Sequence, residues 1–294
     1  MALAAAALPA GGSAHAQQAV NLDSPIMQFH SRPGVARAGN SPLFASPLRT
    51  MPLWRGDLEK ARSAWRKGKY KKARKAFTRA WNNGNLVAAW YLGHIYRLGR
   101  GAKKNPQKAF FFYRQVALAY DPDDIDRKRL MMTVDALVRV AGYYRSGIGR
   151  KKARRDPRRA YRLYNIAAGH GHPAAYYGLG MMALRGEGMK KRPRRAINWL
   201  IKAARGGYAD AALQLARISE NGLKGVVRQD KAAALSWYLV ASAHQRGKVD
   251  EKLLRHIDGI RNSLPEDARQ RATRMARHFI SRSSIPPRAF TMAK

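Results

Sequence analysis

The sequence contains no cysteine among its 294 residues, so it has no disulfide framework, no thiolate metal ligands and no cysteine nucleophile. It also lacks any apolar run near the ~18 residues that a membrane-spanning helix needs, which argues against an integral membrane protein. Acidic residues are scarce: 18 Asp and Glu stand against 57 Lys and Arg, and the formal net charge is +39. Such a charge attracts counter-ions and polyanions to the surface. Hydrophobic residues still make up 46% of the chain, which is enough for a packed core.

The first 53 residues differ from the rest. An apolar Ala/Leu stretch is followed by the small-residue site Ala14-His15-Ala16, and this pattern predicts a secretory signal peptide over residues 1–16. A basic n-region is missing, so the true start lies upstream or the signal is atypical; a merely Ala-rich tail is the alternative. We therefore expect a periplasmic or secreted protein. Five prolines interrupt residues 17–53, which we interpret as a disordered linker.

The remaining sequence repeats itself. Segments aligned on an alanine share apolar or small residues at positions 0, +3, +4, +7 and +8, which lie on one face of an α-helix. The intervals between these anchors are 36, 51, 36 and 38 residues. The five anchors are Ala73, Ala109, Ala160, Ala196 and Ala234.

Helix-capping residues mark both ends of these predicted helices. Good N-cap residues stand four positions before three anchors, at Asn105, Asp156 and Asp230. Pro106, Pro157 and Pro193 occupy the first helical position, where a missing N–H does no harm. A first helix precedes each anchored helix and ends at a glycine suited to positive φ. The glycines in this role are Gly99, Gly147, Gly186 and Gly222.

These motifs resemble the Sel-one-like repeat (SLR), a relative of the tetratricopeptide repeat. The similarity is carried by segments such as Leu179-Gly180, Gly186-Glu187-Gly188 and Ala196-Ile197-Asn198-Trp199-Leu200, and it covers about residues 70–245. The resemblance implies an all-α fold, with helix–turn–helix units stacked into a right-handed α-solenoid superhelix with a concave face. It also implies a scaffold for protein–protein contact, and some exported relatives serve exopolysaccharide secretion or envelope signalling. A few cysteine-rich relatives are linked to β-lactam chemistry, but their disulfides are absent here.

We expect the repeat solenoid to span residues 54–248 and capping helices with a tail to span residues 249–294. An exposed solenoid end needs such a cover. Ser263-Leu264-Pro265-Glu266 resembles a capping box before the last helix. An insertion between Ala117 and Val134 concentrates acidic residues, namely Asp121, Asp123, Asp124 and Asp126.

Nearly half of the Lys and Arg residues gather at the turns that lead into the anchored helices. Cations there oppose the positive end of the helix macrodipole, and Arg192 occupies a cap position where Asp or Asn would be stabilising. Because equivalent turns stack in a solenoid, we expect a basic ridge along one edge that binds an anionic polysaccharide or an acidic protein. The candidate binding residues are Lys103, Lys104, Arg150, Lys151, Lys152, Arg154, Arg155, Lys190, Lys191, Arg192, Arg194 and Arg195.

A simpler interpretation is that Lys and Arg occupy every solvated face of a basic protein. Binding through several anionic groups should weaken steeply as salt is raised, so salt dependence separates the two interpretations.

The sequence shows no catalytic constellation, cofactor motif or metal site. His170 and His172 lie close together, but with too few ligands for a metal we interpret them as part of a solvated loop. The Gly-x-Gly pairs follow predicted helices rather than strands, so they indicate helix stops. Glu187 and Glu220 end first helices without a nucleophile or base beside them in sequence.

Three function classes remain. The first is a non-enzymatic exported scaffold that binds a protein on its concave face. The second is a nucleic-acid-binding protein, although the repeat aromatics are expected in the core and an export signal argues against it. The third, by family analogy alone, is a cell-wall or β-lactam-related hydrolase.

Overall fold

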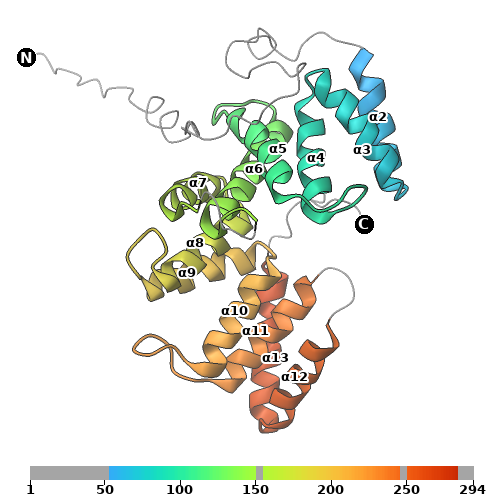
Figure 1. Cartoon of the computed structure of the whole chain (residues 1–294). Coiled ribbons are helices and arrows are strands. Elements are labelled where there is room, and N and C mark those ends of the chain that lie inside the picture. Colours follow the sequence, from blue (N-terminus) through green and yellow to red (C-terminus); the bar gives the residue numbers. More distant parts are fainter. Residues whose placement is uncertain (1–52, 150–154, 246–249, 284–294) are drawn as a thin grey trace, which may run out of the picture. The chain divides into compact units, whose positions relative to one another are not determined.

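A computed structural model describes residues 53–149, 155–245 and 250–283, and only the backbone of residues 53–55. Within those ranges the chain forms twelve α-helices and no named strand (Figure 1). An isolated antiparallel bridge joins Leu223 and Val227. No helix in these ranges is both long and apolar enough to cross a bilayer. The fold is therefore an all-α solenoid, as the repeat pattern predicts.

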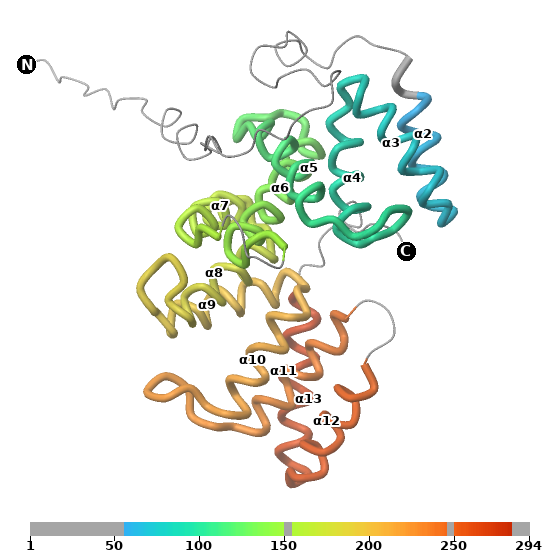
Figure 2. Tube along the Cα trace, viewed as in Figure 1, coloured from blue at the N-terminus to red at the C-terminus, as the bar shows by residue number. Residues whose placement is uncertain are grey.

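The helices divide into two compact units whose boundary, between Thr133 and Val134, falls inside one helix. The first unit holds α2 (Leu53–Arg66), α3 (Tyr70–Asn82), α4 (Leu86–Leu98), α5 (Pro106–Leu118) and the start of α6 (Arg127–Ser146). The second unit holds the rest of α6, then α7 (Pro157–Gly169), α8 (Pro173–Arg185), α9 (Pro193–Arg205), α10 (Ala209–Asn221), α11 (Lys231–His244), α12 (Glu251–Asn262) and α13 (Glu266–Ser281). The Cα trace shows successive helices of each unit turning back on one another as hairpins (Figure 2).

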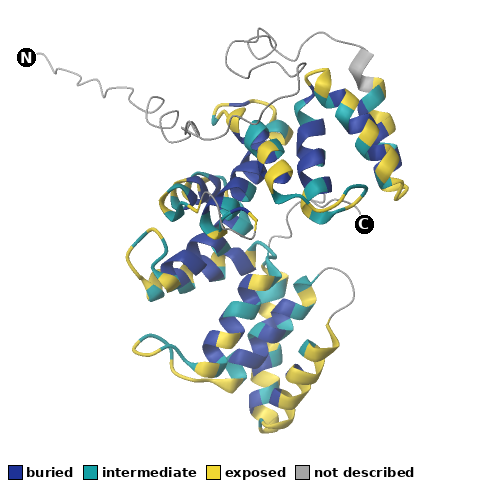
Figure 3. Ribbon diagram, in the orientation of Figure 1, coloured by how far each residue is buried: buried dark blue, intermediate teal, exposed yellow. Residues whose placement is uncertain are grey.

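All five anchor alanines begin the second helix of a hairpin, and each is 0% exposed. The predicted repeat register is thus confirmed. Buried residues gather where the helices of a unit face one another, while exposed residues lie on the outer faces and turns (Figure 3). Small residues allow this close packing: a Cβ on Gly180 in α8 would lie only 2.9 Å from the side chain of Leu200 in α9.

The predicted caps are also confirmed. The side chains of Asn105, Asp156 and Asp230 accept hydrogen bonds from the backbone N–H three residues ahead, at 2.8–3.0 Å. Arg192, at the equivalent position before α9, makes no side-chain cap. Each of these four residues also donates its backbone N–H to a carbonyl near the end of the preceding helix, as Asp156 does to Tyr144 at 2.7 Å. This bond sets the path of the turn between the two helices of a hairpin.

The C-terminal helices pack against the last repeat, and one predicted detail there is wrong. Residues 263–266 do not form a capping box, because the hydroxyl of Ser263 donates back to the carbonyl of Ile260 in α12. Pro265 holds the N-cap position of α13 and makes no side-chain cap. Helix α13 lies along α11, where the ring of Phe279 meets Trp237 edge-on with centroids 4.7 Å apart.

Candidate interaction surface

In the first unit, the turn before α5 rests on the start of α3. Gly101 (φ 78°) lies so close that an added Cβ would be 2.5 Å from the carbonyl carbon of Tyr70 and 2.9 Å from the N of Lys71. Arg74 of α3 donates from Nε to the carbonyl of Gly101 at 3.0 Å. The guanidinium of Arg100 lies 5.4 Å from the centroid of the Tyr70 ring. Two consecutive basic turns are therefore stacked.

The second unit repeats this relationship with different side chains. Gly188, in the turn between α8 and α9, has φ 66°, and an added Cβ would lie 2.6 Å from both carbonyl atoms of Pro157 at the start of α7. Glu187 anchors the same turn, because its carboxylate lies 3.5 Å from Nε of Arg145 and 3.4 Å from a terminal nitrogen of Arg185. The glycine contact, rather than any one ion pair, is what the two units share.

The predicted binding residues in the described ranges remain exposed to solvent on these turns. They are Lys103, Lys104, Arg155, Lys190, Lys191, Arg192, Arg194 and Arg195. The other four, Arg150, Lys151, Lys152 and Arg154, lie outside the described residues. Stacking is seen for consecutive turns within each unit, and a ridge along the whole chain stays a prediction.

None of those eight cations forms an ion pair with an acidic side chain in the described part of the chain. Two are held in other ways: Nε of Arg155 donates to the carbonyl of Arg145 at 3.3 Å, and the guanidinium of Arg195 lies 4.9 Å from the Trp199 ring centroid. Neighbouring cations such as Arg159, by contrast, are paired, here with Asp156 at 3.2 Å. The carboxylates on these turns, Asp156 and Glu187, thus pair with other arginines and leave the eight cations without an ion-pair partner in the described part of the chain.

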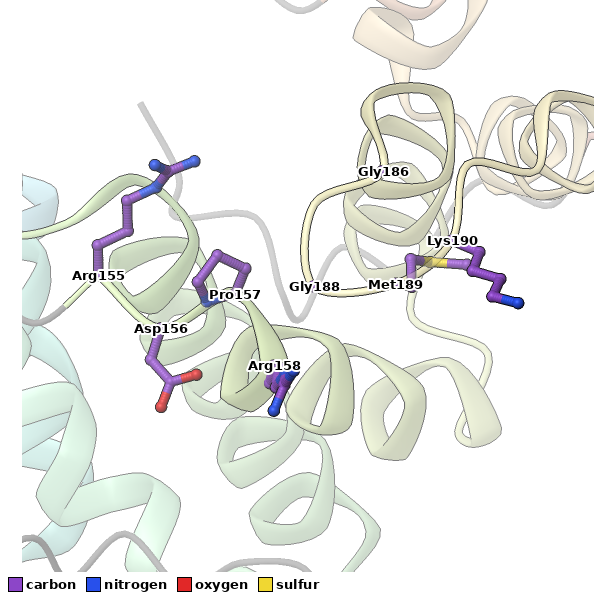
Figure 4. A pocket seen from close by; sticks show the side chains of 8 residues that line it. All are labelled: Arg155, Asp156, Pro157, Arg158, Gly186, Gly188, Met189 and Lys190. Atoms are coloured by element: carbon purple, nitrogen blue, oxygen red, sulfur yellow. The ribbon is translucent and has the colours of Figure 1, made fainter.

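The start of α7 and the turn before α9 enclose an open hollow of about 710 Å³. It is lined by Arg155, Asp156, Pro157, Arg158, Gly186, Gly188, Met189 and Lys190. The Gly186–Lys190 loop arches opposite the Arg155–Arg158 segment, and the carboxylate of Asp156 points away from that loop (Figure 4). An anionic ligand in the hollow could therefore contact the side chains of Arg155, Arg158 and Lys190.

Tyrosines cluster around the first helices of the second unit, a feature the sequence analysis missed. The rings of Tyr177 and Tyr208 lie with centroids 5.0 Å apart. Burial, and then the negative charge of Asp210, raises the pKa of Tyr208 to about 12 and also raises the pKa of Tyr177. Both phenols stay protonated at neutral pH and can donate hydrogen bonds. The spacing of these tyrosines along the chain gives no hint of this contact.

A second cluster joins three helices in the same unit. Glu220 of α10 accepts hydrogen bonds from the hydroxyl of Tyr238 in α11 at 2.7 Å and from Nε2 of His256 in α12 at 3.1 Å. Burial raises the pKa of Glu220, but these two hydrogen bonds outweigh it and hold the pKa below its usual value. Sequence reasoning left Glu220 without partners, because His256 is remote along the chain.

The interpretation of His172 as part of a solvated loop is wrong. Its side chain is 13% exposed, and Nε2 lies 3.6 Å from a carboxylate oxygen of Asp135, which is buried in α6. Burial lowers the pKa of the neighbouring His170. Among the described residues, no group of three or more His, Asp or Glu is placed to hold a metal ion.

Comparison with known proteins identifies the repeat. The Sel1 repeat profile matches residues 86–121, 134–172, 173–208 and 209–245, which together make up half of the chain. The α2–α3 hairpin precedes the matched segments. A crystal structure of a Sel1 repeat protein from Oxalobacter formigenes superposes with a TM-score of 0.53 at 24% identity, covering 75% of this chain and 86% of that one. This likeness concerns the fold.

Two curated relatives are similar over about half of the chain. One, from Rhizobium meliloti (strain 1021), is 34% identical over 151 residues, which is 51% of this chain and 55% of the relative. The other, from Rhizobium leguminosarum bv. viciae, is 31% identical over 150 residues, which is 50% of this chain and 55% of the relative. Both are described as an exopolysaccharide production negative regulator. The chain spans about half the length of these relatives.

Proposed function

The chain belongs to the Sel1 repeat family, and from this premise we propose that it is a non-enzymatic, exported scaffold that takes part in control of exopolysaccharide production. Sel1 repeats mediate protein–protein interaction. We propose that this scaffold binds one protein partner on the concave face that the repeat resemblance implies. Its basic turns would bind an acidic partner or an anionic polymer.

The observation that carries this proposal is the set of exposed cations on stacked turns. At a helix start each exposed cation opposes the macrodipole by about 0.3–1 kcal/mol. The cap position of α9 holds Arg192, where Asp or Asn would stabilise by about 1 kcal/mol. A departure from local stability in several repeats is expected where function requires it. The role in exopolysaccharide control rests on the two relatives.

Export rests on the sequence pattern of residues 1–16, which lie outside the described residues. Cell fractionation tests it directly. We expect the full chain in the periplasmic or extracellular fraction, shortened by about 16 residues, while a variant lacking residues 2–16 stays in the cytoplasm. Recovery of the full-length protein in the cytoplasm would contradict export.

The regulatory role is tested by deleting the gene and measuring exopolysaccharide output. If the chain acts like the relatives, output rises in the deletion strain and returns to the starting level when the full chain is restored. If the deletion leaves exopolysaccharide output unchanged, this regulatory role is contradicted, whatever the protein binds in isolation.

The partner is sought by capture from intact envelope at low and high salt. An acidic partner held by the turns should be lost as salt rises, because exposed charge pairs are screened within a Debye length of about 10 Å at 0.1 M salt. The variant Lys190→Glu, Arg192→Glu on the turns should lose this partner, whereas the matched control Arg274→Glu, Arg277→Glu on α13, at exposed positions outside the turns, should keep it. A partner held equally well at both salt levels would contradict binding through charge.

The two alternative functions suggested by the sequence, nucleic-acid binding and hydrolysis of cell-wall or β-lactam substrates, gain no support from the structure. Proteins that bind single-stranded nucleic acid stack bases on exposed aromatic rings, whereas Tyr113, Tyr164, Trp199 and Tyr238 are all at least 92% buried. For a hydrolase, the described residues would have to present a nucleophile beside a base. Nε2 of His244 lies 3.1 Å from the hydroxyl of Ser283, but that hydroxyl donates to the carbonyl of Ile280 at 2.7 Å. Nδ1 of His244 has no hydrogen-bond partner among the described residues, so no acidic side chain orients this pair.

A further inference from the structure

At the hollow between α7 and α9, two stacked turns contribute cations to the lining of one concave surface. Arg155 and Arg158 come from the start of α7, and Lys190 comes from the turn before α9. All three are exposed and make no ion pair with a described acidic side chain. The close approach of Gly188 to Pro157 fixes the separation of the two turns.

The one carboxylate in the lining does not neutralise these cations. Asp156 accepts the backbone N–H of Arg159 at 3.0 Å, and its other oxygen lies 3.2 Å from Nε of the same residue. It also points away from the Gly186–Lys190 loop (Figure 4). The hollow therefore carries a net positive charge.

The arrangement of the cations favours an extended ligand over a small anion. Arg155 and Lys190 extend away from each other on opposite sides of the hollow (Figure 4), and Arg158 also lines it. A single small anion cannot touch all three, because their charged ends do not converge. An extended ligand with several negative groups can reach each in turn.

The uncharged lining residues favour a peptide over a polysaccharide as the ligand. Pro157 and Met189 present apolar surface between the cations. Methionine adapts its shape to varied apolar partners, and Met and Arg are enriched in protein interfaces. The eight lining residues include no aromatic ring on which a sugar could stack.

We propose that this hollow binds an extended acidic peptide segment of a protein partner, whose carboxylates pair with Arg155, Arg158 and Lys190 while an apolar side chain packs on Met189. This inference rests on the proposed scaffold function and assigns one partner class to one site. An anionic polysaccharide is the competing occupant.

The test uses the full chain and a fluorescent ten-residue peptide of alternating Glu and Leu, followed by polarisation. The double variant Arg158→Glu, Lys190→Glu should weaken binding at least tenfold. The control Arg274→Glu, Arg277→Glu changes the net charge equally and should weaken it less than twofold. Equal weakening in both variants, or none in the first, would overturn the site.

Two further measurements keep the result specific. Met189→Ser should weaken the Glu-Leu peptide several-fold while leaving a Glu-Ser peptide unchanged; no difference between the peptides contradicts the apolar contact. An oligogalacturonate of matched charge should bind more weakly than the Glu-Leu peptide. If it binds more tightly and is lost in the double variant, the hollow is a polysaccharide site and the peptide proposal is wrong. Circular dichroism and the melting temperature verify that each variant is folded.

The site and the scaffold function can fail separately. If the double variant loses the peptide but the gene deletion leaves exopolysaccharide unchanged, the site stands and the proposed role falls. If the deletion raises exopolysaccharide output and the double variant keeps full peptide affinity, the role stands and the hollow is not its acidic-partner site.

Discussion

Gly188 and Pro157 are 31 positions apart in the chain, yet a single added carbon on Gly188 would lie 2.6 Å from the carbonyl of Pro157. Gly101 and Tyr70 show the same relationship in the other unit, also across 31 positions. In both units a positive-φ glycine after a first helix lies on the start of the second helix of the preceding repeat. This contact sets how near consecutive basic turns lie.

Replacing this glycine should therefore separate the turns. Gly188→Ala adds a methyl group at φ 66°, which strains the backbone by about 1–2 kcal/mol. Overlap with the Pro157 carbonyl adds roughly 1–3 kcal/mol more. We expect a clear fall in melting temperature, measured by circular dichroism.

The control for this variant is Gly225→Ala, because Gly225 has a similar φ of 70° and no atom within 4 Å of an added Cβ. It isolates the backbone strain. Equal falls in melting temperature for the two variants would mean that the stacking contact contributes nothing to stability.

Arg192 offers a test of whether helix capping or charge decides the stability of α9. Arg192→Asn supplies the missing cap of α9 and should stabilise the protein by about 1 kcal/mol. Arg192→Ala, which removes the same charge without supplying a cap, should give a smaller gain. Thermal unfolding distinguishes the two, and a gain from Ala as large as that from Asn would show that charge rather than capping decides stability here.

The ion pair of Asp124 predicts that the stability of the first unit depends on pH. The hydrogen bond from the Arg129 guanidinium lowers the pKa of the Asp124 carboxyl against the opposing effect of burial, and one such bond is 2.7 Å long. A lowered folded-state pKa stabilises the protein above the unfolded-state pKa of about 4, and this stabilisation is lost as the pH falls through the folded value.

Asp124→Asn should therefore lower the melting temperature at neutral pH, by an amount equivalent to about 1.5–3 kcal/mol. Toward acid pH the wild type and the variant should converge. The matched control is Asp121→Asn, whose carboxylate accepts, among the described residues, the backbone N–H of Asp123 and no side-chain hydrogen bond. A difference for Asp124→Asn that persists unchanged in acid would contradict the assignment.

The hydrogen bonds of Glu220 predict how firmly α12 is attached. Glu220→Ala removes the acceptor for His256 and should expose the amides of α12 to hydrogen exchange about fivefold faster, corresponding to ~1 kcal/mol. Tyr238→Phe removes only the bond to α11 and should change α12 less. Exchange in α7 and α8 serves as the internal reference. Uniform acceleration across all of these helices would indicate general destabilisation instead.

Much of the fold was predictable because its signals are local. The buried stripe follows from the 3.6-residue period, and Asn105, Asp156 and Asp230 cap helices because the accepting N–H lies three residues away. The last helix was harder to predict at its start. Ser263 ends α12 and its hydroxyl bonds back to Ile260, while the N-cap position of α13 falls two residues later at Pro265.

The sequence by itself determined the repeat, its register and the excess of cations on the turns, because each depends on residues within one or two helical turns of each other. Only the tertiary structure decided which turns lie in contact, that His172 reaches Asp135, and that Glu220 joins three helices. These contacts join residues from 18 to 37 positions apart. Their distances depend on how helices pack, and no local pattern encodes that.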